Sequence, residues 1–215
     1  MLILLVGLGE WQVQRLHWKQ NILTTIDRQI HQAPVDLFSL LDRDDNNYRP
    51  VLTSGRFLND KTFYLLAISQ AGVGGYDVLT PLLTTEGHYL LVNRGWIPYA
   101  NKSSADYLRP LSTVNIEGIL RRPEHSWLQS KNDPSHNVWY WIDFPAMAQA
   151  ADLPDFLPYV LDIEASPAEG SYPIGGQTRV TLPNNHFVYA ITWFGLAFAL
   201  LVIYFLSSFP KDAED

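Results

Sequence analysis

Residues 187–209 read FVYAITWFGLAFALLVIYFLSSF, a run of 23 residues without Asp, Glu, Lys or Arg. As an α-helix the run would be about 34 Å long, slightly more than the hydrocarbon core of a bilayer. Tyr189 and Trp193 lie toward one end and Tyr204 toward the other, as is typical of residues at the two membrane surfaces. A buried core helix is the alternative, but soluble helices rarely keep this length apolar on every face. The run therefore predicts a transmembrane helix, followed by a short tail over 210–215.

The opposite end of the chain begins MLILLVGLGEW, an apolar run that stops at Glu10. Its nine residues are about half of what a membrane span needs. A secretory signal peptide fits poorly, because no basic segment precedes the run and no small-residue cleavage site follows it. We interpret residues 1–9 as the distal part of a first transmembrane helix that is truncated in this sequence. Residues 10–186 are then expected to form one extramembrane domain between two helices.

The extramembrane domain is predicted to begin with a helix and to continue as β-structure. Apolar residues recur at helical spacing over residues 11–32, which predicts a leading amphipathic helix. Later, Asp143 precedes Phe-Pro and is expected to cap a helix that runs through Ala151. After Pro50 the chain consists of short runs with the composition of β-strands. They predict seven strands, over residues 51–57, 63–68, 78–85, 88–97, 114–122, 138–143 and 159–163.

Strands this short and closely spaced are typical of barrels and sandwiches. We therefore predict a membrane-anchored α+β protein, whose β-rich extramembrane domain is an antiparallel barrel or sandwich between two transmembrane helices.

Composition excludes several classes of partner and cofactor. The formal net charge is −7 and the 15 Lys and Arg residues are scattered along the chain, so electrostatic binding to nucleic acid is not expected. The chain has no cysteine, which excludes disulfides, thiolate metal sites, iron–sulfur clusters and covalent haem attachment. Any metal chemistry must therefore use histidine or carboxylate ligands.

One histidine stands out by its position. His186 directly precedes the predicted span, whereas the other five histidines are isolated in sequence and are most simply surface or strand residues. The plain interpretation of His186 is a polar residue at the membrane surface, with Asn184 or Asn185 capping the helix. The sharper interpretation is an axial ligand of haem, because neutral imidazole binds haem iron and the aromatic Trp193, two turns on, suits the macrocycle. A single histidine would leave the second axial position open, as a carrier that releases its cargo requires.

Arg179 lies in a glycine-containing loop that approaches the predicted membrane helix. Its guanidinium could pair with a haem propionate by charge complementarity. A structural salt bridge explains the residue equally well.

Five stretches resemble the Surfeit locus protein 1 family of cytochrome c oxidase assembly factors. They are LGEWQVQRLHWKQNIL (8–23), SGRFLNDKTFYL (54–65), GYDVLTPL (75–82), LVNRGWIP (91–98) and PIGGQTRVTLPNNHFVYAITWFGLA (173–197). The resemblance spans nearly the whole chain. None of the five stretches would suffice alone, but together they are specific.

The resemblance implies a membrane protein that assists maturation of the haem–copper oxidase. Two membrane helices would enclose a domain on the periplasmic or intermembrane-space side, and the protein would bind haem a and help to insert it into oxidase subunit I. The family's candidate haem ligand corresponds to His186. Haem a synthase, oxidase subunit I and membrane lipid are the implied partners. No Arg-rich presequence precedes Leu8, which favours a bacterial inner membrane over the mitochondrial one.

Two functions remain open on the sequence. The first is a non-enzymatic haem-handling factor in which His186 ligates the iron, Trp193 contacts the ring and Arg179 holds a propionate. The alternative is a haem-free membrane scaffold that holds oxidase subunits and haem synthase together. No sequence motif supports a membrane-anchored hydrolase, because the chain contains no nucleophile elbow, Walker loop or His-Glu-x-x-His sequence.

Overall fold

The computed structural model describes residues 1–215 except for 42–45, 105–111, 124–129, 165–170, 177–184 and 209–215. The chain divides into two units. We call Met1–Arg28 together with Val180–Asp215 the helical unit, and Gln29–Arg179 the β domain.

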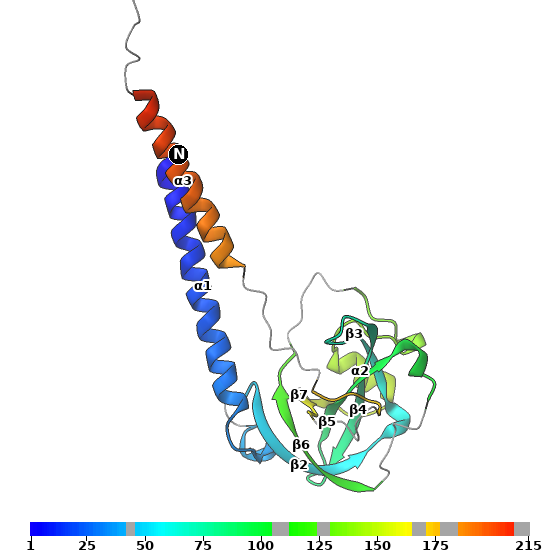
Figure 1. Ribbon diagram of the computed structural model, residues 1–215. Helices are drawn as coiled ribbons and strands as arrows, with labels where there is room; N and C mark the ends of the chain where they lie inside the picture. Colours follow the sequence, from blue (N-terminus) through cyan, green and yellow to red (C-terminus); the bar gives the residue numbers. More distant parts are fainter. Residues whose placement is uncertain (42–45, 105–111, 124–129, 165–170, 177–184, 209–215) are drawn as a thin grey trace, which may run out of the picture. The chain divides into compact units, whose positions relative to one another are not determined.

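The β domain is built on a single seven-stranded sheet (Figure 1). The strands are β1 (Val35–Asp36), β2 (Arg49–Phe57), β3 (Phe63–Ile68), β4 (Gly74–Thr84), β5 (Tyr89–Pro98), β6 (Thr113–Arg121) and β7 (Phe156–Asp162). Their order is β1-β2-β6-β7-β5-β4-β3, and β2 also pairs with β4. That additional pairing closes β2, β6, β7, β5 and β4 into a barrel, in which each of these five strands has a neighbour on both sides. Short 3₁₀ turns lie at η1 (Leu37–Ser39), η2 (Asn59–Lys61), η3 (Tyr99–Asn101) and η4 (Pro134–His136).

A glycine allows the barrel to close. Gly55 of β2 pairs with Thr84 of β4, and a Cβ at Gly55 would lie 2.5 Å from the carbonyl oxygen of Leu83. That separation is shorter than any ordinary contact, so a side chain at this position would push β2 away from β4. The stretch SGRF of the sequence therefore has a direct structural role in closing the sheet.

The β-rich prediction is confirmed, but the prediction of an antiparallel sheet is wrong at two pairings. Strand β5 pairs with β7 in parallel, and β1 pairs with β2 in parallel. The parallel β5–β7 pair arises because the chain leaves β5, forms β6 and a helix, and only then returns to lie between β5 and β6. Parallel neighbours require a long crossover of this kind.

One predicted strand is absent and one observed strand was not predicted. Residues 138–143 form only isolated bridges, between Leu65 and Trp139 and between Asp133 and Val138. They lead instead into α2 (Phe144–Ala151), whose first turn is capped by Asp143 through a 3.1 Å bond from the Ala146 amide, as predicted. The two-residue β1 was missed because so short a strand has no periodicity.

Two apolar clusters hold the β domain together. One is enclosed by the barrel strands and includes Val51, Leu82, Leu90, Val92 and Leu161. The other lies on the outer side of β4, β5 and β7, where α2 packs, and is centred on the fully buried Trp139 and Met147. The barrel is therefore supported on both surfaces of these strands.

The helical unit consists of α1 (Leu2–Ile30, whose last two residues belong to the β domain) and α3 (His186–Ser208). Figure 1 shows the two helices side by side and running in opposite directions. Among the described residues, α3 is the one helix that is long and apolar enough to cross a membrane. Most of its large apolar side chains are exposed, with Phe198 and Leu206 both at 68%. An exposed apolar surface of this extent on one helix is consistent with membrane anchoring. The two-helix membrane topology stays a prediction.

Candidate functional site

His186 is the first residue of α3 and is half-buried. The carbonyl of Asn185 accepts a 3.2 Å hydrogen bond from the amide of Tyr189, which begins the helical ladder. The imidazole therefore stands at the boundary between the polar loop sequence and the apolar helix. Its backbone is fixed by the helix, so only the side-chain torsions position the ring.

The ring of His186 is held by α1. Its Nδ1 lies 2.7 Å from Oε1 of Gln12, and the Gln12 side chain is buried, with 8% exposure. An amide oxygen accepts hydrogen bonds and does not donate them, so with Oε1 facing the ring this contact requires the proton on Nδ1. In the neutral ring this leaves Nε2 without a proton and with its lone pair available.

Nε2 is the atom of chemical interest. Within the described part of the chain, the bond to Gln12 is the only hydrogen bond of the His186 side chain. An unprotonated imidazole nitrogen whose partner nitrogen donates to an oxygen is the usual arrangement of a metal-ligating histidine. The arrangement suits the iron of a haem, which can bind one imidazole nitrogen from the protein on a given face.

Small residues let α1 and α3 approach near this pair. A Cβ at Gly9 would lie 2.7 Å from Cε1 of Phe194, so the aromatic ring occupies the space that a larger residue would fill. Ala190 and Ala197 of α3 are also buried, each at 4% exposure. Gly9 and Gln12 are three residues apart and share a face of α1. The contact at Gly9 therefore lies on the same face of α1 as the contact of Gln12 with His186.

The structure brings only some of the predicted site residues together. Trp193 follows His186 by seven residues and lies on the same side of α3, about 10 Å further along the axis. It is half-exposed, and its side chain forms no hydrogen bond or ring contact with another described residue. Arg179 lies outside the described residues. The role of each toward haem stays a prediction.

Two features of α1 were not assigned from the sequence. The local sequence around Gln12 does not mark it as a functional residue, because its hydrogen-bond partner lies 174 residues away. Arg15 lies over the ring of Trp11 at 5.8 Å and over that of Trp18 at 5.0 Å, and both rings are about half exposed. The Trp11–Arg15–Trp18 series places a cation between two aromatic side chains on the exposed surface of α1.

The remaining histidines do not form a second site. His17, His31, His88 and His136 are exposed, and His125 lies outside the described residues. Among the residues that the structure describes, no group of three or more His, Cys, Asp or Glu could hold a metal ion. His136 bonds the carboxylate of Asp133 at 2.8 Å, and hydrogen bonds from Ser135 and His136 lower the pKa of Asp133 to about 2.

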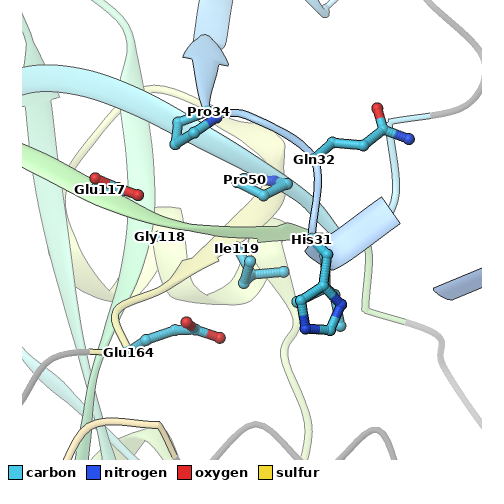
Figure 2. Close-up of a pocket in the computed structure, with 9 residues that line it drawn as sticks. His31, Gln32, Pro34, Pro50, Glu117, Gly118, Ile119 and Glu164 are labelled. Carbon is cyan, nitrogen blue, oxygen red and sulfur yellow. The ribbon is translucent and has the colours of Figure 1, made fainter. Parts of the chain in front are cut away.

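The β domain has an open pocket of about 320 Å³ (Figure 2). His31 and Gln32 from the segment after α1 line it together with Glu117, Ile119 and Glu164. Figure 2 shows Glu117 and Glu164 on the two sides of the β6 segment that carries Ile119. The polar groups here are dispersed and exposed, and they do not form the catalytic arrangement of a nucleophile beside a base.

A charged cluster is buried in the β domain. Arg121 Nε donates to Asp162 at 2.8 Å, and Asn93 Nδ2 donates to the same carboxylate at 3.1 Å. The amide of Gly95 donates in turn to Asn93 Oδ1 at 3.0 Å. Burial and the neighbouring Asp162 raise the pKa of Asp77 to about 6, against the opposing effect of Arg121. Asn93, Arg121 and Asp162 satisfy one another, so these three residues have a structural role: they join β5, β6 and β7.

Comparison with known proteins gives one consistent result. A family model described as the SURF1 family matches residues 1–198. The chain is 34% identical to Surfeit locus protein 1 of Xenopus tropicalis over 215 residues, which cover 90% of this chain and 68% of that protein. It is 32% identical to Surfeit locus protein 1 of Homo sapiens and 34% identical to a SURF1-like protein of Drosophila melanogaster. Each alignment covers 93% of this chain and 72% of the relative.

Proposed function

The chain belongs to the SURF1 family, and from this membership and the geometry of His186 we propose that it is a haem-binding assembly factor for the haem–copper cytochrome c oxidase. In this proposal the protein receives haem a from haem a synthase and assists its insertion into subunit I. It performs no covalent chemistry of its own. Haem a is therefore its cargo.

The observation that carries the proposal is the free Nε2 of His186. The ring is oriented by Gln12 through a 2.7 Å contact at Nδ1, and in its neutral form it would offer Nε2 as an unprotonated nitrogen at the end of an apolar helix. The donor set fits haem iron, which binds neutral imidazole, and the apolar surface of α3 fits a hydrophobic macrocycle. One protein ligand leaves the opposite axial position free, so a receiving histidine could bind the iron before His186 releases it.

Membrane attachment follows from the same residues. We propose that α3 crosses the bilayer, that residues 1–9 are the distal part of a first membrane helix, and that the β domain lies on the periplasmic side of a bacterial inner membrane. His186 then lies at the membrane surface, where a cargo as apolar as haem a would travel between two membrane proteins. Trp193 would contact the macrocycle, and Arg179 would pair with a propionate.

The proposed function is tested in cells that make haem a but lack their own SURF1 family protein. Wild-type chain should restore the haem a absorption of the oxidase, and His186→Ala should not. The exposed His17 of α1 provides the matched control, since His17→Ala should restore the oxidase fully. Full restoration by His186→Ala would overturn the proposal and favour the haem-free scaffold. The scaffold would then be tested by co-purification with subunit I and haem a synthase.

A further inference from the structure

We propose that Gln12 is a positioning residue that selects the tautomer of His186 and thereby makes Nε2 the ligating nitrogen. The inference rests on the proposed function for the identity of the ligand. The tautomer itself is a property of the protein without haem.

The contact has the features of a selective hydrogen bond. The two atoms are 2.7 Å apart, the Gln12 side chain is 8% exposed, and His186 is half-buried. Where water is largely excluded it competes weakly for both groups, so the hydrogen bond is stronger than it would be at an exposed position. A histidine ring in water favours the proton on Nε2, which would block ligation through that atom. An acceptor opposite Nδ1 reverses this preference.

The helices hold the acceptor in place. Gln12 comes from α1 and His186 from α3, and the close approach of Gly9 to Phe194 sets the register of one helix on the other. The amide oxygen is thereby presented to Nδ1 by a rigid element. Positioning residues that act through a ligand are typically held in this way.

The hydrogen bond also adjusts the strength of the ligand. An acceptor on the Nδ1 proton increases electron density on Nε2, which strengthens its bond to a metal. Loss of such an outer partner typically costs about 10-fold to 100-fold in metal affinity. Gln12 is therefore expected to raise the retention of haem without touching it.

The direct test is the tautomer of His186 in the haem-free full-length protein. Protein labelled with ¹⁵N-histidine is purified in detergent, and the His186 signals are identified by their loss in His186→Ala. The proton is expected on Nδ1 in the wild type and to move toward Nε2 in Gln12→Leu. Gln12→Glu, which keeps an acceptor oxygen, should restore the wild-type state. Gln14→Leu is the matched control, because Gln14 is exposed on the same helix and bonds Glu10.

A second measurement uses titration of the same variants with haem. Gln12→Leu should bind haem about 10-fold to 100-fold more weakly, Gln12→Glu should bind close to the wild-type level, and Gln14→Leu should not differ. A wild-type His186 with its proton on Nε2 would overturn the inference, because the amide NH₂ of Gln12 would then be donating to the ring. That result is independent of whether haem binds. Absence of haem binding beside the expected tautomer would instead overturn the proposed function and leave the positioning role of Gln12 intact.

Discussion

The β domain and the helical unit each contain a buried polar pair, and the two pairs are satisfied to different degrees. In the β domain, Arg121 and Asp162 are 2.8 Å apart and Asn93 bonds the same carboxylate. In the helical unit, Oε1 of Gln12 and Nδ1 of His186 are 2.7 Å apart, and Nε2 of the ring has no hydrogen-bond partner among the described residues. A fully satisfied cluster stabilises a fold. A pair with one atom free can bind something else, which is the role that we propose for His186.

The two units also differ in where their apolar residues lie. The β domain encloses its apolar residues in the barrel and beneath α2. In α3, by contrast, Phe198, Tyr204 and Leu206 are between 68% and 69% exposed. The surface of α3 is therefore suited to an apolar environment, whereas the β domain encloses its apolar residues.

The largest expected effect comes from breaking the polar pair of the β domain. Arg121→Met would leave Asp162 buried without its cation, and removal of one member of such a pair typically costs about 3 kcal/mol or more. We expect a loss of about that size in the free energy of unfolding of the β domain, measured by tryptophan fluorescence in denaturant. The double variant Arg121→Met/Asp162→Leu should recover part of this loss. In Gln12→Leu, by contrast, the stability of the β domain should not change. An equal loss in Gln12→Leu would remove the distinction between the two pairs.

A smaller effect is expected from Asp77, whose pKa in the folded protein is raised to about 6 by burial and by Asp162. Between about pH 4 and pH 6 the folded state holds more protons on Asp77 than the unfolded state, so this carboxylate lowers stability as the pH rises through that window. Asp77→Asn removes the effect and should stabilise the protein by at most about 3 kcal/mol at pH 7 and hardly at all at pH 4. Unfolding measured at both pH values checks the prediction. A difference that does not change with pH would contradict it.

The smallest effect is expected in the helical unit. Gly9→Leu would collide with Phe194, displace α1 from α3 and weaken the bond between Gln12 and His186. We expect haem affinity to fall about tenfold while the unfolding of the β domain stays unchanged. Gly7→Leu is the matched control, since a Cβ at Gly7 meets no atom within 4 Å. Equal affinity in the two variants would show that the approach of the helices does not position His186.

Features that depend on local sequence could be predicted. The apolar run over 187–209 predicted a helix that the structure places at His186–Ser208, and Asp143 caps α2 as expected. The position of His186 at the start of the apolar helix was also visible, because it depends only on where the charged and apolar residues lie.

Features that depend on distant pairings could not be predicted. The closure of β2 on β4 at Gly55, the parallel pairing of β5 with β7 and the contact of Gln12 with His186 each join residues far apart in the chain. The segment around Trp139 has the composition of a strand, yet it is buried without a continuous strand partner. For the three pairings and for the segment around Trp139, tertiary packing decides the structure and local propensity does not.

The central claim is that Nε2 of His186 binds the iron of haem. The most direct measurement is the visible absorption spectrum of detergent-purified wild type, His186→Ala and His17→Ala, each co-expressed with the enzymes that make haem a. The account predicts a Soret band in the wild type and in His17→Ala, and its collapse in His186→Ala while the amount of purified protein stays the same. A Soret band of equal strength in all three proteins, or in none of them, would contradict it.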